Sequence, residues 1–261
     1  MIPKVNLSDV DLQRLIDAVV SVGDWLLAEQ SRVRLVEVKS NATPLTNADQ
    51  EADAQLRAVL QAATPTVPIL SEEGEVPEYS VRKGWDCFWL VDPLDGTKEY
   101  MSGRPDFTVN VALVTGQQPV LGIVYAPGSG ELYWGSEGGS FMKKNGKTKR
   151  IFSQPLSSKG NSVVILESRS HPSKETEEYL TRFQVAGRIQ MGSSLKICRV
   201  AAGEGDLYPR LGPTMEWDTA AADAVYRFSG DTNPRYSPLK YNKPDMHNPH
   251  FVIGVGPEEQ P

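Results

Sequence analysis

The sequence predicts a mixed α/β fold, with α+β character in its first half. Three observations lead to this prediction: apolar residues recur at helical spacing near the start, residues 107–141 have the pattern of a β-meander with glycine-marked turns, and strands alternate with helices beyond Val163. The chain has 261 residues, which exceeds the usual size of a single core. We therefore expect one large domain or two closely packed ones.

The first helix is predicted over the apolar pattern at residues 12–27, with Ser8 as its candidate N-cap. Residues 41–44 are typical of a turn. A second helix is expected at about residues 47–62, because this segment is rich in Ala, Gln, Glu and Leu and is followed by two prolines. Asp53, within this helix, is expected to face solvent.

Two short apolar runs, residues 67–70 and 87–91, are typical of buried strands, and each leads into acidic residues. Residues 143–150 are basic and polar, as in a solvated hairpin tip. The polar stretch at residues 154–161 is the predicted domain boundary. It divides the chain into residues 1–155 and 156–261.

Beyond this boundary the predicted elements alternate between strands and helices. The strands are expected at residues 163–166, 187–191, 207–208 and 251–255, and the helices at residues 174–183, 194–202 and 216–228. Such alternation is typical of an α/β unit.

Charge and cysteine content argue against several classes of protein. A net charge of −6 and a pI near 5.2 disfavour binding of a nucleic-acid polymer, which needs a basic surface to neutralise phosphates. Cys87 and Cys198 are the only cysteines and lie in apolar segments, so we expect buried thiols rather than a disulfide or a zinc site. No apolar run is long enough for a transmembrane segment and no secretory signal is visible, so the default compartment is cytoplasmic.

The principal chemical motif is Asp-Pro-Leu-Asp-Gly-Thr, which starts at Asp92 directly after a predicted strand. Asp92 and Asp95 lie three residues apart on a turn and can converge on one point, with the Leu94 carbonyl between them. Such hard oxygen donors are the ligands that Mg²⁺ prefers. The amides around Gly96 and Thr97 could hold a phosphate if a helix begins there. A simple turn with incidental acids is the alternative.

Three further acidic stretches lie at predicted element boundaries. Glu72 follows a strand and would meet Asp92 if the two strands are neighbours, although a solvated loop is the alternative. Asp49 stands three residues after Thr46, as in a capping box, and Asp218 precedes a run of alanines, where a cap is again the simpler explanation. Four such stretches together would assemble a site with several carboxylates and room for more than one cation.

These four stretches together resemble the inositol monophosphatase superfamily of magnesium-dependent, typically lithium-sensitive phosphatases. The run Asp-Pro-Leu-Asp-Gly-Thr-Lys-Glu is similar to the CysQ-type branch, the 3'(2'),5'-bisphosphate nucleotidases. The resemblance implies a layered αβαβα sandwich of the sugar-phosphatase type. Further similar stretches occur in family order over nearly the whole chain: Ser71-Glu-Glu, Phe107-Thr-Val-Asn-Val-Ala-Leu, Gly122-Ile-Val-Tyr-Ala-Pro, Ser168-Arg-Ser-His171, Gly192-Ser-Ser-Leu-Lys196, Leu207-Tyr-Pro-Arg210 and Trp217-Asp-Thr-Ala-Ala.

The resemblance also implies roles for individual residues. Asp49 and Thr97 would be catalytic and would orient and deprotonate the attacking water. Residues 1–155 would form the metal-binding domain and residues 156–261 the substrate-binding domain. The ligands of two or three Mg²⁺ ions would be Glu72, Asp92, Leu94 (through its carbonyl), Asp95 and Asp218. The substrate-binding residues would be Gly96, Thr97, Ser168, His171, Ser193, Lys196 and Arg210.

The implied reaction is hydrolysis of the 3'-phosphate of adenosine 3',5'-bisphosphate to AMP and phosphate by metal-activated water. Lys196 and Arg210 would pair with the non-scissile 5'-phosphate, and His171 would contact phosphate or sugar. Judged by position alone, His171 is an ordinary loop residue and Lys196 a solvent-facing helix residue.

The chain departs from the branch at a few positions. Gly74 stands where an acidic residue is frequent, and Ala222 where a glycine is frequent. Both lie outside the implied ligand positions. The loop His247-Asn-Pro-His250 is also somewhat variant.

Several alternatives stay open at this point. An inositol monophosphatase or a fructose-1,6-bisphosphatase would use the same metal core, and a non-catalytic phosphometabolite-binding protein would keep the fold without turnover. No stretch has the spacing of an EF-hand, and His247 and His250 lie on a proline-containing loop that does not favour a zinc site. The sequence leaves open a monomer or a homodimer, peripheral association with the inner face of a membrane, and a role in sulfur assimilation, salt tolerance or nucleotide salvage.

Overall fold

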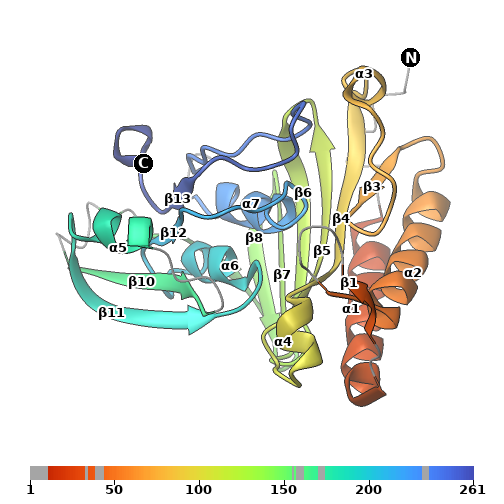
Figure 1. Cartoon of the computed structure of the whole chain (residues 1–261), viewed down its shortest axis with the longest axis horizontal. Helices are drawn as coiled ribbons and strands as arrows, with labels where there is room; N and C mark the ends of the chain where they lie inside the picture. Colours follow the sequence, from red (N-terminus) through yellow and green to blue (C-terminus); the bar gives the residue numbers. More distant parts are fainter. Residues whose placement is uncertain are drawn as a thin grey trace.

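The computed structural model describes residues 11–32, 35–38, 44–154, 156, 162–169, 174–230 and 235–261. Helices and sheets alternate in layers across the molecule: a helical pair, a large sheet, a second helical pair, smaller sheets and an outer helix (Figure 1). The predicted mixed α/β fold with αβαβα layering is therefore confirmed. None of the helices in the described ranges combines the length and the apolar character that crossing a bilayer requires.

The central layer is a seven-stranded sheet with the strand order β3-β4-β5-β6-β7-β8-β9. β3 and β4 are parallel, whereas all the other neighbouring strands in it are antiparallel. The predicted meander is confirmed and is extended by β9. The bounds are β3 Ile69–Ser71, β4 Cys87–Asp95, β5 Thr108–Thr115, β6 Gln118–Ala126, β7 Glu131–Ser136, β8 Gly139–Lys144 and β9 Lys147–Ile151.

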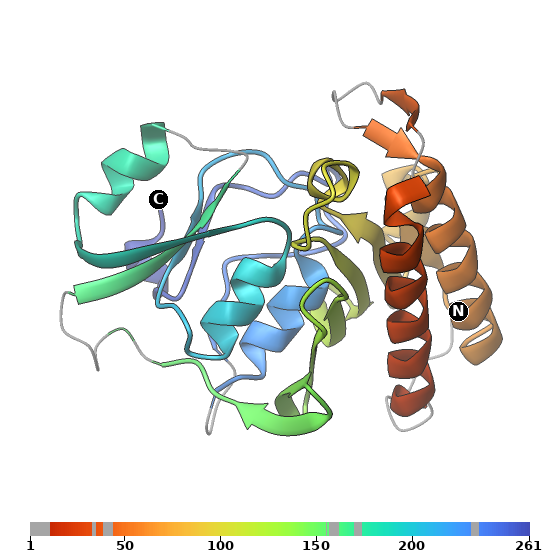
Figure 2. The ribbon, with the colours of Figure 1, turned by 90° about the horizontal axis from the view of Figure 1, so that it is seen from below.

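Two helices, α1 and α2, cover one face of this sheet (Figures 1 and 2). Each buries one apolar stripe, and in α1 the stripe includes Leu15, Val19 and Leu26. α1 begins after Asp11, whose side chain accepts a hydrogen bond from the backbone of Arg14, and the predicted cap Ser8 lies outside the described residues. The elements of this layer are α1 Leu12–Glu29, η2 Gln30–Arg32, β1 Leu35–Val38, β2 Pro44–Thr46 and α2 Asn47–Ala63.

The opposite face of the sheet is covered by α6 (Leu195–Ala201) and α7 (Ala220–Arg227). α7 lies very close to the strands, because two glycines of the sheet face it. A Cβ atom placed on Gly122 would lie 2.1 Å from the Ala221 carbonyl oxygen, and one on Gly135 would lie 2.7 Å from the Cα of Val225. Glycine is therefore required where this helix crosses β6 and β7.

Beyond α6 and α7 lie smaller sheets. β10 and β11 are parallel, β12 and β13 are antiparallel, and a bridge between Ile165 and Leu207 joins the two pairs. α5 lies outside this layer (Figure 1). The bounds are β10 Ser162–Ser168, α5 Lys174–Leu180, β11 Gln184–Met191, β12 Tyr208–Arg210, β13 Phe251–Ile253 and η4 Pro257–Glu259, and the short helices of the first half are α3 Tyr79–Arg82 and α4 Thr97–Met101.

Two sequence-based expectations were wrong. The helix expected from residue 216 begins at Ala220, because the backbone of Thr219 has φ −121°, outside the helical range. Asp53 does not face solvent. Its residue is 8% exposed and its Oδ2 lies 2.6 Å from Nε of Arg57, so the carboxylate packs against a cation.

Other expectations about the fold were confirmed. Cys87 and Cys198 are free and buried. The basic segment at residues 143–150 forms the exposed β8–β9 hairpin. The boundary predicted at residues 154–161 lies mostly outside the described residues, and one apolar cluster contains residues from both halves, such as Phe88 and Tyr226. The division into two domains at residue 155 stays a prediction.

We expect Gly122→Ala to lower the free energy of unfolding by roughly 1–3 kcal/mol, because the added methyl group overlaps the backbone of α7 and the helix must move. Gly187→Ala, in β11, is the matched control, since nothing lies within 4 Å of its Cβ position. Urea denaturation of both variants measures the difference. Equal stabilities for the two variants would show that α7 does not depend on this close approach.

Candidate active site

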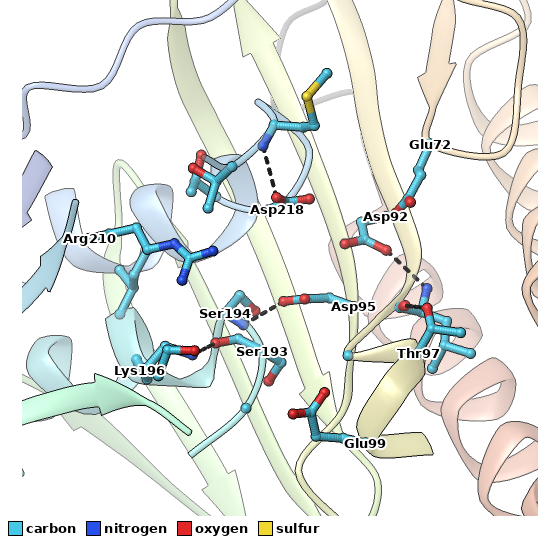
Figure 3. A pocket seen from close by; sticks show the side chains of 18 of the residues that line it. Glu72, Asp92, Asp95, Thr97, Glu99, Ser193, Ser194, Lys196, Arg210 and Asp218 are labelled. Atoms are coloured by element: carbon cyan, nitrogen blue, oxygen red, sulfur yellow. Dashed lines mark hydrogen bonds between the residues drawn. The ribbon is translucent and has the colours of Figure 1, made fainter. Parts of the chain in front are cut away.

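A cavity of about 310 Å³ opens where the edge of the central sheet meets the second half of the chain (Figure 3). Acidic side chains line one end of the cavity, and we call Glu72, Asp92 and Asp218 the acidic end. Lysine and arginine line the other side, and we call Lys196 and Arg210 the basic wall. One end of the cavity therefore carries acidic side chains, and the other side carries basic ones.

The acidic end is assembled from three separate segments. β3 and β4 are parallel neighbours, so Glu72 and Asp92 leave the same edge of the sheet, and the Glu72 amide donates to the Val91 carbonyl at 3.1 Å. Asp218 comes from the turn before α7, where its Oδ2 accepts a hydrogen bond from the Met215 amide at 2.8 Å. Carboxylate oxygens of the three residues lie within 4.8 Å of one another. A hard divalent cation fits such a donor set.

Asp95 lies beside this group but is turned toward the second half of the chain. β4 pairs with β5 through a register shift between Asp92 and Asp95, so the strand continues to Asp95 instead of ending before the motif. Oδ2 of Asp95 accepts a hydrogen bond from the backbone amide of Ser194 (Figure 3). Thr108 Oγ1 and Asn110 Nδ2 each lie 3.5 Å from the same oxygen. One carboxylate oxygen of Asp95 is thus held by the residue that caps α6 and by side chains of β5.

Asp49 and Thr97 lie next to each other, and Thr97 lines the cavity. Oγ1 of Thr97 lies 3.2 Å from Oδ1 of Asp49 and 3.2 Å from the Leu94 carbonyl oxygen. Asp49 also closes the predicted capping box, since its Oδ2 accepts a hydrogen bond from the Thr46 amide at 2.8 Å. The two Asp49 oxygens therefore serve different partners, and capping does not exclude a second role.

The turn after β4 places backbone amides beside the cavity. Gly96 has φ 95°, a left-handed conformation that glycine adopts without strain, and it precedes α4. A helix does begin at Thr97, which is the condition under which the sequence predicted a phosphate-binding turn. Asp92 stabilises this turn, because its Oδ1 accepts a hydrogen bond from the Leu94 amide at 3.1 Å.

Burial and mutual repulsion raise the pKa values of these carboxylates. The pKa of Asp92, which is 1% exposed, is raised well above its usual value by burial and then by the negative charges of Glu72, Asp95 and Asp218. Burial and the charges of Asp95 and Glu72 raise the pKa of Asp218 in the same way. The pKa of Asp95 is raised to about 6, mainly by burial, with Lys196 opposing the shift. A bound cation would relieve this repulsion.

Lys196, in the basic wall, is buried rather than solvent-facing. It is 3% exposed, and its Nζ donates to the carbonyls of Ser193 at 2.5 Å and Met191 at 3.3 Å. Burial lowers its pKa to about 8. Nζ also lies 5.2 Å from the centre of the Tyr208 ring. The reading of Lys196 as an ordinary surface residue was wrong, because α6 packs it under the Met191–Ser193 loop.

The remaining predicted substrate residues are distributed as follows. Ser168, Ser193 and Arg210 line the cavity. Nη2 of Arg210 donates to the Pro213 carbonyl at 3.0 Å, and its buried Nε has no hydrogen-bond partner among the described residues. His171 lies outside the described residues.

Sequence reasoning missed several residues that line the same cavity. Glu99, Ser194 and His247 all reach it, and none was a candidate for the site. Ser194 lies within the stretch Gly192-Ser-Ser-Leu-Lys196 that the resemblance marked, so this stretch was a usable signal. No local pattern pointed to His247, which arrives from a loop near the end of the chain.

Comparison with known proteins agrees with this arrangement. The model of the inositol monophosphatase family matches residues 10–247. The 3'(2'),5'-bisphosphate nucleotidase CysQ of Escherichia coli (strain K12) is 40% identical over 240 residues, which are 90% of this chain and 96% of that protein. The crystal structure of CysQ from Bacteroides thetaiotaomicron has a TM-score of 0.75 at 36% identity and covers 92% of this chain and 95% of its own. The IMPase of Thermotoga maritima has a TM-score of 0.70 at 27% identity, covering 82% and 81%.

The fold and the acidic cavity are those of a metal-dependent phosphatase. The chain belongs to the inositol monophosphatase family.

We expect Asp92→Asn to stabilise the metal-free protein, and the gain should grow as pH rises from 4 to 7. The unfolded chain releases its aspartate protons near pH 3.9, whereas in the folded protein the pKa of Asp95 is raised to about 6 and the pKa values of Asp92 and Asp218 are raised well above their usual value. Because the folded state binds more protons in this window, rising pH lowers the free energy of unfolding. The amide removes one of these charges.

The measurement is the Tm in EDTA as a function of pH for the wild type and the variant. Asp86→Asn, at an exposed position, is the isosteric control and should leave the curve unchanged. An Asp92→Asn protein that is no more stable than the wild type at pH 7 would show that repulsion at the acidic end is negligible.

Proposed function

We propose that this chain is a magnesium-dependent phosphomonoesterase that hydrolyses the 3'-phosphate of adenosine 3',5'-bisphosphate to AMP and phosphate. The main support is that one cavity contains both the acidic end and the basic wall. The acidic end suits cations and the phosphate under attack, while the basic wall suits a second, non-scissile phosphate. Relatives named 3'(2'),5'-bisphosphate nucleotidases, 40% identical over most of the chain, support the same substrate.

The chemistry of the donor set supports Mg²⁺ as the cation, with two or three ions in the site. The proposed ligands are Glu72, Asp92, the Leu94 carbonyl, Asp95 and Asp218. When bound, such ions lower the pKa of water and neutralise negative charge on the phosphate oxygens. The oxygens of Glu72, Asp92 and Asp218 already lie close together, and Asp95 would contribute the oxygen that Ser194 does not hold.

Asp49 and Thr97 are the proposed proton acceptors for the attacking water. Thr97 Oγ1 can accept a hydrogen bond from water while it donates its own proton toward Asp49 Oδ1, 3.2 Å away. Asp49 is 1% exposed, so bulk water does not compete freely for its carboxylate. The pair thus orients the nucleophile and provides a place for its proton. Phosphoryl transfer requires mainly positioning and charge stabilisation, so no covalent nucleophile is needed.

The remaining contacts are proposed from the turn before α4 and from the second half of the chain. The amides of Gly96 and Thr97 would hold the scissile phosphate at the start of α4. Arg210 has an unpartnered, buried Nε beside the cavity and would pair with the 5'-phosphate together with Lys196. The nucleoside contacts would be made by Ser168, His171 and Ser193.

An inositol monophosphatase is the second candidate, because the Thermotoga maritima IMPase has a similar fold at 27% identity. The single phosphate of an inositol monophosphate would bind at the acidic end in the same way. A monophosphate, however, would leave the basic wall without an anionic partner, and this favours a bisphosphate substrate.

We expect phosphate release with Mg²⁺ to be fastest from adenosine 3',5'-bisphosphate when it is compared with inositol 1-phosphate and fructose 1,6-bisphosphate. Asp95→Asn should abolish release from all three, because it removes a proposed metal ligand. Preference for inositol or sugar phosphate would keep the metal chemistry and contradict the proposed role of the basic wall. No turnover of any of the three would favour a non-catalytic phosphometabolite-binding protein.

We expect Thr97→Val to lower kcat by about 10²-fold or more, since it removes the hydroxyl between the water and Asp49 but keeps the shape of the side chain. Thr97→Ser should retain most of the activity, and Thr148→Val, on the exposed β8–β9 hairpin, is the control. Calorimetric Mg²⁺ binding should change little in the Val variant. A parallel loss of Mg²⁺ affinity would instead indicate that Thr97 acts through the metal site.

A further inference from the structure

His247 lines the cavity, although neither the resemblance nor the sequence pattern gives it a role. It belongs to a segment that crosses back over the site near the end of the chain, and we call residues 239–250 the C-terminal strap. The strap has no regular secondary structure, so its position must come from contacts with other segments.

Backbone hydrogen bonds join the strap to the turn that carries Asp218. The Glu216 amide donates to the Met246 carbonyl at 2.9 Å, and the Asn248 amide donates to the Thr214 carbonyl at 2.8 Å. Met215 and His247 form an antiparallel bridge between these two bonds. The backbone of His247 is therefore fixed against the cavity wall.

Buried side chains add to this attachment. Glu216 is fully buried, and its carboxylate accepts hydrogen bonds from the amides of Asn242 at 2.6 Å and Lys243 at 3.0 Å and from Lys243 Nζ at 2.6 Å. Arg82, in α3, donates to the Asn242 side chain at 3.1 Å and to the Pro244 carbonyl at 2.8 Å. A carboxylate buried with such complete pairing holds the strap in one position.

The imidazole of His247 is oriented by its neighbour Asp245. Nδ1 lies 2.7 Å from Asp245 Oδ1, and the His247 amide donates to the same oxygen at 2.9 Å. Nε2 has no hydrogen-bond partner among the described residues. Because the Asp245 carboxylate can only accept, Nδ1 carries a proton, and Nε2 becomes a donor when an anion bound beside it holds a second proton on the ring. His247 therefore presents an unpartnered ring nitrogen on a fixed backbone.

The groups that share this part of the cavity include Arg210, whose buried Nε is also unpartnered, and the Thr214–Met215 segment that bridges to the strap. Arg210 donates to the Pro213 carbonyl and His247 bridges to Met215, so both side chains line the cavity along residues 213–215. An anion with several oxygens, such as a phosphate, can accept from both.

We propose that His247 is a specificity-determining residue that donates a hydrogen bond from Nε2 to the non-scissile phosphate of the substrate, alongside Arg210. This inference rests on the proposed function, because it requires a substrate with a second phosphate. It predicts that His247 discriminates between a bisphosphate and the matching monophosphate and does not affect the chemical step itself.

The test compares kcat/KM for adenosine 3',5'-bisphosphate with kcat/KM for adenosine 3'-monophosphate. His247→Ala should lower this ratio about tenfold, the usual effect of losing a hydrogen bond to a charged group. His247→Arg should restore most of the ratio, because it returns a cationic donor. His250→Ala is the matched control: His250 is exposed on the same strap but does not line the cavity, and its removal should leave the ratio unchanged.

An unchanged ratio in His247→Ala would overturn the inference. A fall in kcat/KM of equal size for both substrates would also overturn it, since His247 would then act by holding the Asp218 turn. The wild-type measurement separates failure of the inference from failure of the proposed function. A wild type that releases no phosphate from the bisphosphate would overturn the proposed function and the inference with it, whereas a wild type that prefers the bisphosphate leaves the His247 variants as the deciding result.

Discussion

Crowding of carboxylates at one edge of the central sheet is the constraint on which the rest of the site depends. Glu72, Asp92 and Asp218 place oxygens within 4.8 Å of one another, and burial with mutual repulsion raises the pKa values of Asp92 and Asp218. Such an arrangement costs folding free energy when the carboxylates are charged, and only a stiff backbone keeps them together. Parallel pairing of β3 with β4 and the hydrogen bond from the Glu72 amide supply that stiffness. Cation binding and folding stability are therefore linked in this protein.

The packing of α7 against the central sheet determines where Asp218, the third of these carboxylates, lies. Asp218 stands at the entry to α7, and α7 can lie against the sheet only because Gly122 and Gly135 present no side chain to it. A bulkier residue at either position would push the helix outward and carry the Asp218 turn with it. The C-terminal strap holds the same turn from the other side through the buried carboxylate of Glu216.

Hydrogen bonds between the two halves of the chain keep the two ends of the cavity at a constant separation. Ser194 donates from its amide to Asp95, and its hydroxyl lies 2.8 Å from Asn110 Oδ1 and 3.1 Å from Thr108 Oγ1. Lys196 follows on the same helix, so the basic wall is attached to the strand that carries the acidic motif. The separation between the acidic motif and the basic wall, which a substrate with two phosphates must match, is therefore set by buried contacts and not by mobile loops.

The sequence by itself determined the local chemistry: the acidic turn at Asp92, the capping box that contains Asp49, and the strands and most of the helices. These features follow from turn residues and apolar periodicity, which act over a few neighbouring positions. Similarity to a known family also predicted the layered fold. Only the tertiary structure decided that Asp53 is buried, that Lys196 is buried under a loop, and that His247 reaches the cavity. The exposure and partners of a side chain depend on which distant segment packs against it, and local periodicity carries no information about that segment.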